Sequence, residues 1–131
     1  MLEFEPEDET PFPHKKITEA IIGSVFEVYK HLGYGFLHRV YQRSLQVELT
    51  RRGLSGDLEK RTTVRYKDVV VGEYDGDMVV NDVVLVEIKI APQYDKRDEA
   101  QLLNVLKATG VKVGILLNFG RYKVEFKRLI F

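Results

Sequence analysis

Two acidic residues and one lysine near the middle of the chain have the types and spacing of a phosphodiester-cleaving site. Asp77 lies ten residues before Glu87, and Lys89 follows Glu87 after a single intervening residue. Two carboxylates on neighbouring strands can hold Mg²⁺, a hard cation that prefers oxygen ligands and keeps several waters. The metal would polarise a phosphoryl oxygen and lower the pKa of a bound water, while the lysine would orient that water or stabilise charge on the phosphate.

The segment 83–90 that carries two of these residues has the pattern of a buried strand. Because side chains alternate along a strand, Glu87 and Lys89 share one face with Val83 and Leu85, and the opposite face is entirely apolar. Strands this apolar are normally covered on both sides, and burying charges costs several kcal/mol unless they are paired or bind a metal. The alternative is that Glu87 and Lys89 form a solvated face or a simple ion pair.

A shared metal requires Asp77 and Glu87 to point to the same side of their hairpin. A two-residue turn at 81–82 would place Asp77 opposite Val86, and Glu87 would then face the other way. The two carboxylates share a face only if the loop has an odd length, such as 81–83, or if a bulge intervenes. Asn81 and Asp82 both tolerate the left-handed conformation that such a loop needs. We therefore predict an odd-length loop or a bulge.

The hydrophobic pattern predicts a small α/β fold around this hairpin. Apolar residues recur at helical steps, and three segments end at or near glycine, whereas other segments are rich in β-branched residues. The predicted helices are 16–32, 37–52 and 97–109, and the predicted strands are 62–66, 69–80, 83–90, 111–117 and 121–130. The order αα-βββ-α-ββ favours a mixed sheet flanked by helices, in which an antiparallel meander is joined by one parallel strand after the helical crossover.

Composition and charge restrict the functions that the chain can have. The 131 residues suit a single domain, which we place at 14–131. Residues 1–13 are predicted to be a flexible acidic arm, because five acids and no basic residue occur in the first 12 positions. The remaining residues have 20 basic and 15 acidic side chains, a balance of +5 that permits phosphate contact but also suits an ordinary solvated surface. Without cysteine, a signal sequence or a membrane-length apolar run, a cytoplasmic location without membrane association is expected.

The chain resembles the PD-(D/E)XK nuclease superfamily, and within it the GxxExxY family of small proteins. Asp77 followed by Glu87-Ile88-Lys89 carries the first resemblance. The second rests on several further stretches, namely 23–35, 35–41, 75–77, 86–89, 99–106 and 110–119. The resemblance implies a restriction-endonuclease-like core, Mg²⁺ or Mn²⁺ as cofactor, and a nucleic-acid partner, with DNA favoured over RNA.

Three further residues acquire candidate roles, two of them, His38 and Gln101, through the resemblance. His38 stands where the family motif has glutamate, so it either keeps the metal site with a shifted metal preference or marks partial loss of activity. A histidine at the edge of an amphipathic helix is the third alternative. Gln101 occupies the place of a glutamine that would contact phosphate or a metal-bound water, unless it is simply solvated. Glu27 lies above small residues of its helix and would support the site, unless it is an exposed helix residue.

These observations leave three interpretations. The first is a metal-dependent nuclease with Asp77, Glu87 and His38 as ligands, Lys89 and Gln101 in the chemistry, and Glu27 in support. The second is a non-catalytic module on a decayed nuclease fold that binds nucleic acid or protein. The third is a structural or regulatory protein that forms a homodimer through its exposed last strand.

Overall fold

The computed structural model describes residues 12–58 and 60–131, so residues 1–11 of the predicted acidic arm lie outside the described residues. The elements in chain order are α1 (Lys15–Leu32), α2 (His38–Arg51), β1 (Gly56–Asp57), β2 (Arg61–Tyr66), β3 (Val69–Asp75), β4 (Met78–Val80), β5 (Val84–Lys89), α3 (Arg97–Thr109), β6 (Val113–Phe119) and β7 (Val124–Ile130). In this part of the chain, every helix is too short or too polar to span a bilayer.

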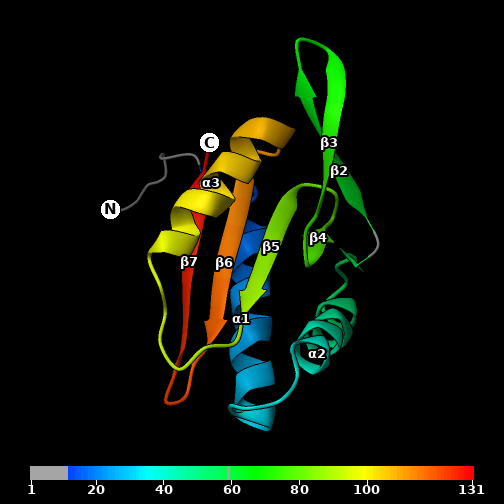
Figure 1. The fold of residues 1–131 in the computed structure, drawn as a ribbon. Coiled ribbons are helices and arrows are strands. Elements are labelled where there is room, and N and C mark those ends of the chain that lie inside the picture. Colours follow the sequence, from blue (N-terminus) through cyan, green and yellow to red (C-terminus); the bar gives the residue numbers. More distant parts are fainter. Residues whose placement is uncertain (1–11, 59) are drawn as a thin grey trace, which may run out of the picture.

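Five strands form a mixed sheet in the order β1-β4-β5-β6-β7, in which β5 and β6 are parallel and the other neighbours are antiparallel. Helix α3 covers one face of the sheet and α1 the other, with α2 beside α1 (Figure 1). The apolar stripe of α1 and the Tyr41-Leu45-Leu49 stripe of α2 pack on the even-numbered side chains of β5. Leu102 and Leu106 of α3 pack on Leu85 from the opposite side. The predicted mixed α/β fold with one parallel pair is confirmed.

The predicted meander of three strands is wrong in one respect, because β2 and β3 form a separate two-stranded sheet. This hairpin turns at Lys67 and Asp68, which both have left-handed backbones, and it extends beyond the main sheet (Figure 1). The predicted strand 69–80 is divided into β3 and β4 by a break at Gly76. A Cβ at Gly76 would lie 2.9 Å from Leu85 Cδ1, so the chain passes over the central strand at a distance that suits glycine.

The hairpin between β4 and β5 confirms the predicted odd-length loop. Its register pairs Met78 with Val86 and Val80 with Val84, which leaves the three residues 81–83 in the loop. Asn81 and Asp82 have φ angles of 50° and 62°, the left-handed values that the prediction required. Continued by one residue, this register sets Asp77 opposite Glu87, and both side chains fall on the same side of the hairpin.

Candidate functional site

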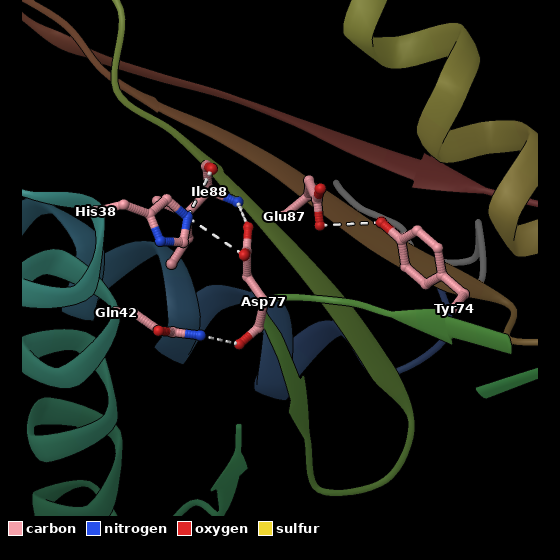
Figure 2. Close-up of polar contacts among 6 residues, drawn as sticks. All are labelled: His38, Gln42, Tyr74, Asp77, Glu87 and Ile88. Carbon is pink, nitrogen blue, oxygen red and sulfur yellow. Dashed lines mark hydrogen bonds and ion pairs between the residues drawn. The ribbon is translucent and has the colours of Figure 1, made fainter. Parts of the chain in front are cut away.

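The candidate site lies where β4 ends and the central strand β5 continues without a neighbour on that side. Ile88 of β5 therefore has no strand partner there for its backbone groups. The Asp77 carboxylate accepts the Ile88 N–H at 2.7 Å through Oδ2, and His38 Nε2 lies 3.2 Å from the Ile88 carbonyl oxygen (Figure 2). Two side chains thus replace the missing strand, which satisfies backbone groups that are costly to leave unpaired. Asp77 and His38 are fixed in place by the same contacts.

His38 is oriented as a hydrogen-bond donor. Its Nε2 atom lies 3.2 Å from Asp77 Oδ1 and 3.2 Å from the Ile88 carbonyl, and both oxygens are acceptors. The tautomer with a proton on Nε2 satisfies both contacts, and in that tautomer this nitrogen has no lone pair for a metal. In this arrangement the imidazole positions Asp77, and the role of His38 as a metal ligand stays a prediction. Gln42, one turn further along α2, donates to the Asp77 backbone carbonyl at 2.7 Å (Figure 2).

Glu87 is a partly buried carboxylate next to Asp77. Burial raises the pKa of Glu87 above its ordinary value of 4.5, and the charge of Asp77 raises it further. A hydrogen bond from the Tyr74 hydroxyl, at 3.0 Å from Oε1, opposes this shift together with the charge of Lys89 and a backbone hydrogen bond from Asp77. Burial and the charge of Glu87 also raise the pKa of Tyr74, so its hydroxyl remains a donor (Figure 2). Two ionised carboxylates here repel each other, and a cation between them would relieve that cost.

The structure brings four of the predicted site residues to one open pocket of about 530 Å³. Its lining residues are Phe36, Leu37, His38, Asp77, Glu87, Ile88, Lys89 and Ile90. Gln101 of α3 joins Glu87 and Lys89 at a small adjoining pocket, which is also lined by Tyr74 and Asp98. Among the described residues, the Lys89 side chain makes no hydrogen bond, and its charge acts on Glu87. The ammonium group is therefore available to a ligand in the main pocket.

Glu27 is not brought to this pocket. It lies in a separate groove between α1 and α2, where its carboxylate is 3.4 Å from His31 Nδ1. The small face of α1 was expected to aim Glu27 at the site, but its Gly23 lies beside the end of α2 instead. A Cβ on Gly23 would lie 2.6 Å from the Arg52 guanidinium, so this face is already covered.

The donor set restricts the kind of metal that the pocket can hold. Among residues 12–58 and 60–131, no three His, Asp or Glu side chains lie close enough together to bind one ion. Structural and catalytic zinc sites use three or four protein ligands, so zinc does not fit. Mg²⁺ needs only one or two carboxylates when waters and substrate phosphate complete its coordination shell. Asp77 and Glu87 therefore fit a Mg²⁺-like ion, and Mn²⁺ accepts the same oxygen ligands.

Sequence reasoning missed Tyr74 and Gln42. Along an unbroken strand, Tyr74 and Asp77 would face opposite sides, so strand alternation argued against a place for Tyr74 in the site. The break at Gly76 changes this alternation and brings the Tyr74 hydroxyl to Glu87. Gln42 had a usable signal, because it stands four residues after His38 on the same helix face. That spacing places both side chains on Asp77.

Comparisons with known proteins agree with this fold. The crystal structure of SSO0001 matches with a TM-score of 0.54 at 16% sequence identity, over 88% of this chain and 58% of that protein, and it shows similarity of fold. The chain thus spans less than two thirds of the protein it matches. No curated protein matches the sequence. The sequence profile of the PD-(D/E)XK nuclease superfamily matches residues 15–129, which include all of the described helices and every described strand residue except Ile130, and the chain therefore belongs to this superfamily.

Proposed function

We propose that this protein is a metal-dependent nuclease that hydrolyses phosphodiester bonds in nucleic acid, with DNA favoured over RNA, and that it is a GxxExxY-type member of its superfamily. The observation that carries the proposal is the placement of Asp77 opposite Glu87, with Lys89 on the same face of β5, in an open pocket. A partly buried carboxylate pair has an energetic cost without a cation, and such costs are typical of functional sites.

Asp77 and Glu87 are the proposed metal ligands, and the chain holds both before any ligand binds. The Ile88 N–H and His38 fix the two oxygens of Asp77, and the Tyr74 hydroxyl fixes one oxygen of Glu87. A bound Mg²⁺ or Mn²⁺ would supply Lewis-acid polarisation of the phosphate and acidify a water. Because the ligands are already oriented, little reorganisation is needed when the metal and substrate enter.

Lys89 and Gln101 are the proposed groups for the substrate and the attacking water. The Lys89 ammonium shares the Glu87 face of β5 and has no hydrogen bond to other described residues, so it can orient water or stabilise negative charge on the phosphate. Gln101 is exposed on the first half of α3 beside both residues, where its amide can donate to a phosphate oxygen or accept from a water.

A cleavage panel tests the proposal. Single- and double-stranded DNA and RNA are incubated with the protein in Mg²⁺, in Mn²⁺ and in EDTA. We expect cleavage that requires metal and is lost in Glu87→Gln and Lys89→Met. The exposed variant Glu19→Gln is the matched control, because it removes one carboxylate from α1 outside the pocket. No cleavage of any substrate in either metal would refute the nuclease proposal.

His38 gives one reason to keep the non-catalytic alternative. The family motif has a carboxylate at this position, and the imidazole instead donates hydrogen bonds to Asp77 and Ile88. If the glutamate of the motif is an essential third ligand, the present pocket would bind nucleic acid without cutting it. Nucleic-acid binding in EDTA with no cleavage in either metal would favour this alternative.

A further inference from the structure

Two large apolar side chains are exposed at the mouth of the carboxylate pocket. Phe36 is 49% exposed and Leu37 is 78% exposed, and both line the pocket with Asp77, Glu87 and Lys89. Exposed apolar side chains that gather beside a polar site commonly mark a surface for a ligand. The ligand in question has an apolar flat part next to an anionic part, because the aromatic ring and the ammonium group of Lys89 line the same pocket.

The Phe36 ring is held in place by a buried aromatic stack. It packs edge-on against Tyr41, at 6.3 Å between ring centroids, and Tyr41 is fully buried and stacks on Phe119 at 4.4 Å. The Tyr41 hydroxyl accepts the Phe36 N–H at 3.4 Å and donates to the Gly33 carbonyl at 2.5 Å. The loop 33–37 is therefore tied to the core. An exposed ring that is already immobilised loses little conformational entropy when a ligand stacks on it.

Aromatic and basic groups continue from Phe36 along the same end of the molecule. The Arg121 guanidinium lies over the ring of Tyr34, two residues earlier in the loop, at 5.9 Å from the ring centroid. Arg121 belongs to the turn between β6 and β7, which also presents Tyr122 with 87% of its surface exposed. Aromatic faces alternating with cationic groups are the usual arrangement for binding single-stranded nucleic acid, because bases stack and phosphates pair with the cations.

We propose that Phe36 is a stacking platform for an unpaired base next to the scissile phosphate, so that the substrate class is single-stranded or locally unpaired nucleic acid. The inference rests on the proposed nuclease function and specifies its substrate. In a duplex, each base is stacked on its neighbours, and its face is not available to a protein ring. An unpaired base can turn its face to Phe36 while its phosphate lies toward Lys89 and the carboxylates.

Binding in EDTA tests the proposal without cleavage. A fluorescent single-stranded oligonucleotide of about 12 nucleotides and its duplex are titrated with wild-type protein and with Phe36→Ala, and anisotropy is recorded. We expect Phe36→Ala to weaken single-strand binding roughly 5- to 100-fold, the range for loss of one base–aromatic stack, and Phe36→Trp to restore it. Phe26→Ala is the matched control, because Phe26 is 48% exposed and packs edge-on against Phe126 at 6.2 Å but does not line the pocket.

An abasic scan of the oligonucleotide identifies the stacked base. One abasic position should weaken binding to the wild type as much as Phe36→Ala does, and should cause no further loss in that variant. Thermal unfolding of Phe36→Ala and Phe26→Ala checks that both remain folded. Equal single-strand affinity of Phe36→Ala and Phe26→Ala would overturn the inference.

The inference and the nuclease proposal fail in different ways. Metal-dependent cleavage of duplex that Phe36→Ala leaves unchanged would support the nuclease and overturn the stacking platform. Single-strand binding that depends on Phe36, without cleavage in either metal, would support the platform and refute the nuclease.

Discussion

Glu87→Gln should make the protein more stable at neutral pH while it removes cleavage. Burial and the neighbouring Asp77 charge both disfavour the ionised form of Glu87. Glutamine has nearly the same shape, keeps an oxygen that can accept the Tyr74 hydroxyl, and carries no charge. The substitution therefore removes the repulsion with Asp77 and the cost of burying a charge, and leaves the local contacts in place.

The gain in unfolding free energy should be about 0.5–2 kcal/mol, the usual range for one stabilising substitution. The hydrogen bond from Tyr74 and the Lys89 charge already favour the ionised form and reduce the gain. Glu87 also lies at an open pocket, where solvent screens its interaction with Asp77. Both effects place the expected gain near the lower end of the range.

The pH dependence gives the prediction its sign. The folded protein raises the pKa of Glu87 above 4.5, so the folded state holds this proton more tightly than the unfolded state does. The resulting stabilisation of the wild type is fully present below pH 4.5 and is lost as the pH rises through the folded pKa. The advantage of Glu87→Gln should therefore be absent near about pH 4, grow above it and become constant at higher pH.

Urea denaturation in EDTA, repeated between about pH 4 and pH 8, measures this advantage. Glu19→Gln is the control, because Glu19 is exposed on α1 and should give no comparable rise with pH. Addition of Mg²⁺ should then stabilise the wild type more than Glu87→Gln, since only the wild type keeps both carboxylates. A variant that is less stable at neutral pH, or an advantage that does not change with pH, would refute the account of Glu87 as a strained ligand.

Substitutions at three positions separate structural from chemical roles. Asp77→Ala should lower the unfolding free energy by about 1–3 kcal/mol, because the Ile88 N–H and His38 lose their acceptor, and Asp77→Asn should cost less when both are measured in urea. Lys89→Met should reduce the cleavage rate about 100-fold or more and change the unfolding free energy by less than about 0.5 kcal/mol, whereas wild-type cleavage would exclude Lys89 from the mechanism. His38→Glu should lower the unfolding free energy in EDTA by about 1–3 kcal/mol, because a carboxylate then faces Asp77 Oδ1 and the Ile88 carbonyl. Mg²⁺ should restore this stability, and a melting temperature of the variant that Mg²⁺ leaves unchanged would contradict the prediction.

Local periodicity was sufficient to predict the third helix and the two parallel strands at the site. The third helix was predicted at 97–109 and is found at Arg97–Thr109, where an amphipathic repeat ends at Gly110 with a left-handed backbone. The β5 strand and its parallel partner β6 were also predicted, because long apolar runs after a helical crossover have few alternatives. In these segments the residues that determine the secondary structure belong to the segment itself, so the sequence alone is sufficient to predict it.

Contacts between distant segments were not predictable in this way. The alternation of β2 and β3 is the same whether they join the main sheet or form a hairpin of their own, so periodicity does not distinguish the two arrangements. Gly76 interrupts the predicted strand 69–80, and its role depends on the approach of Leu85 nine residues later. Glu27 was misplaced for the same reason, since the partner of the small face of α1 is Arg52 of another segment.

His38 connects the chemistry of the pocket to the end of the β4 strand. Because β4 begins at Met78 and does not extend alongside Ile88, the Ile88 carbonyl needs a donor and the Ile88 N–H needs an acceptor. Histidine supplies the donor and Asp77 the acceptor, and the hydrogen bond between them aligns the carboxylate. A glutamate at position 38 could not donate to that carbonyl when ionised, so a third carboxylate here would need a metal to be stable. The histidine therefore allows the pocket to stay ordered without metal, and it leaves Asp77 and Glu87 as the two carboxylates proposed to bind the ion.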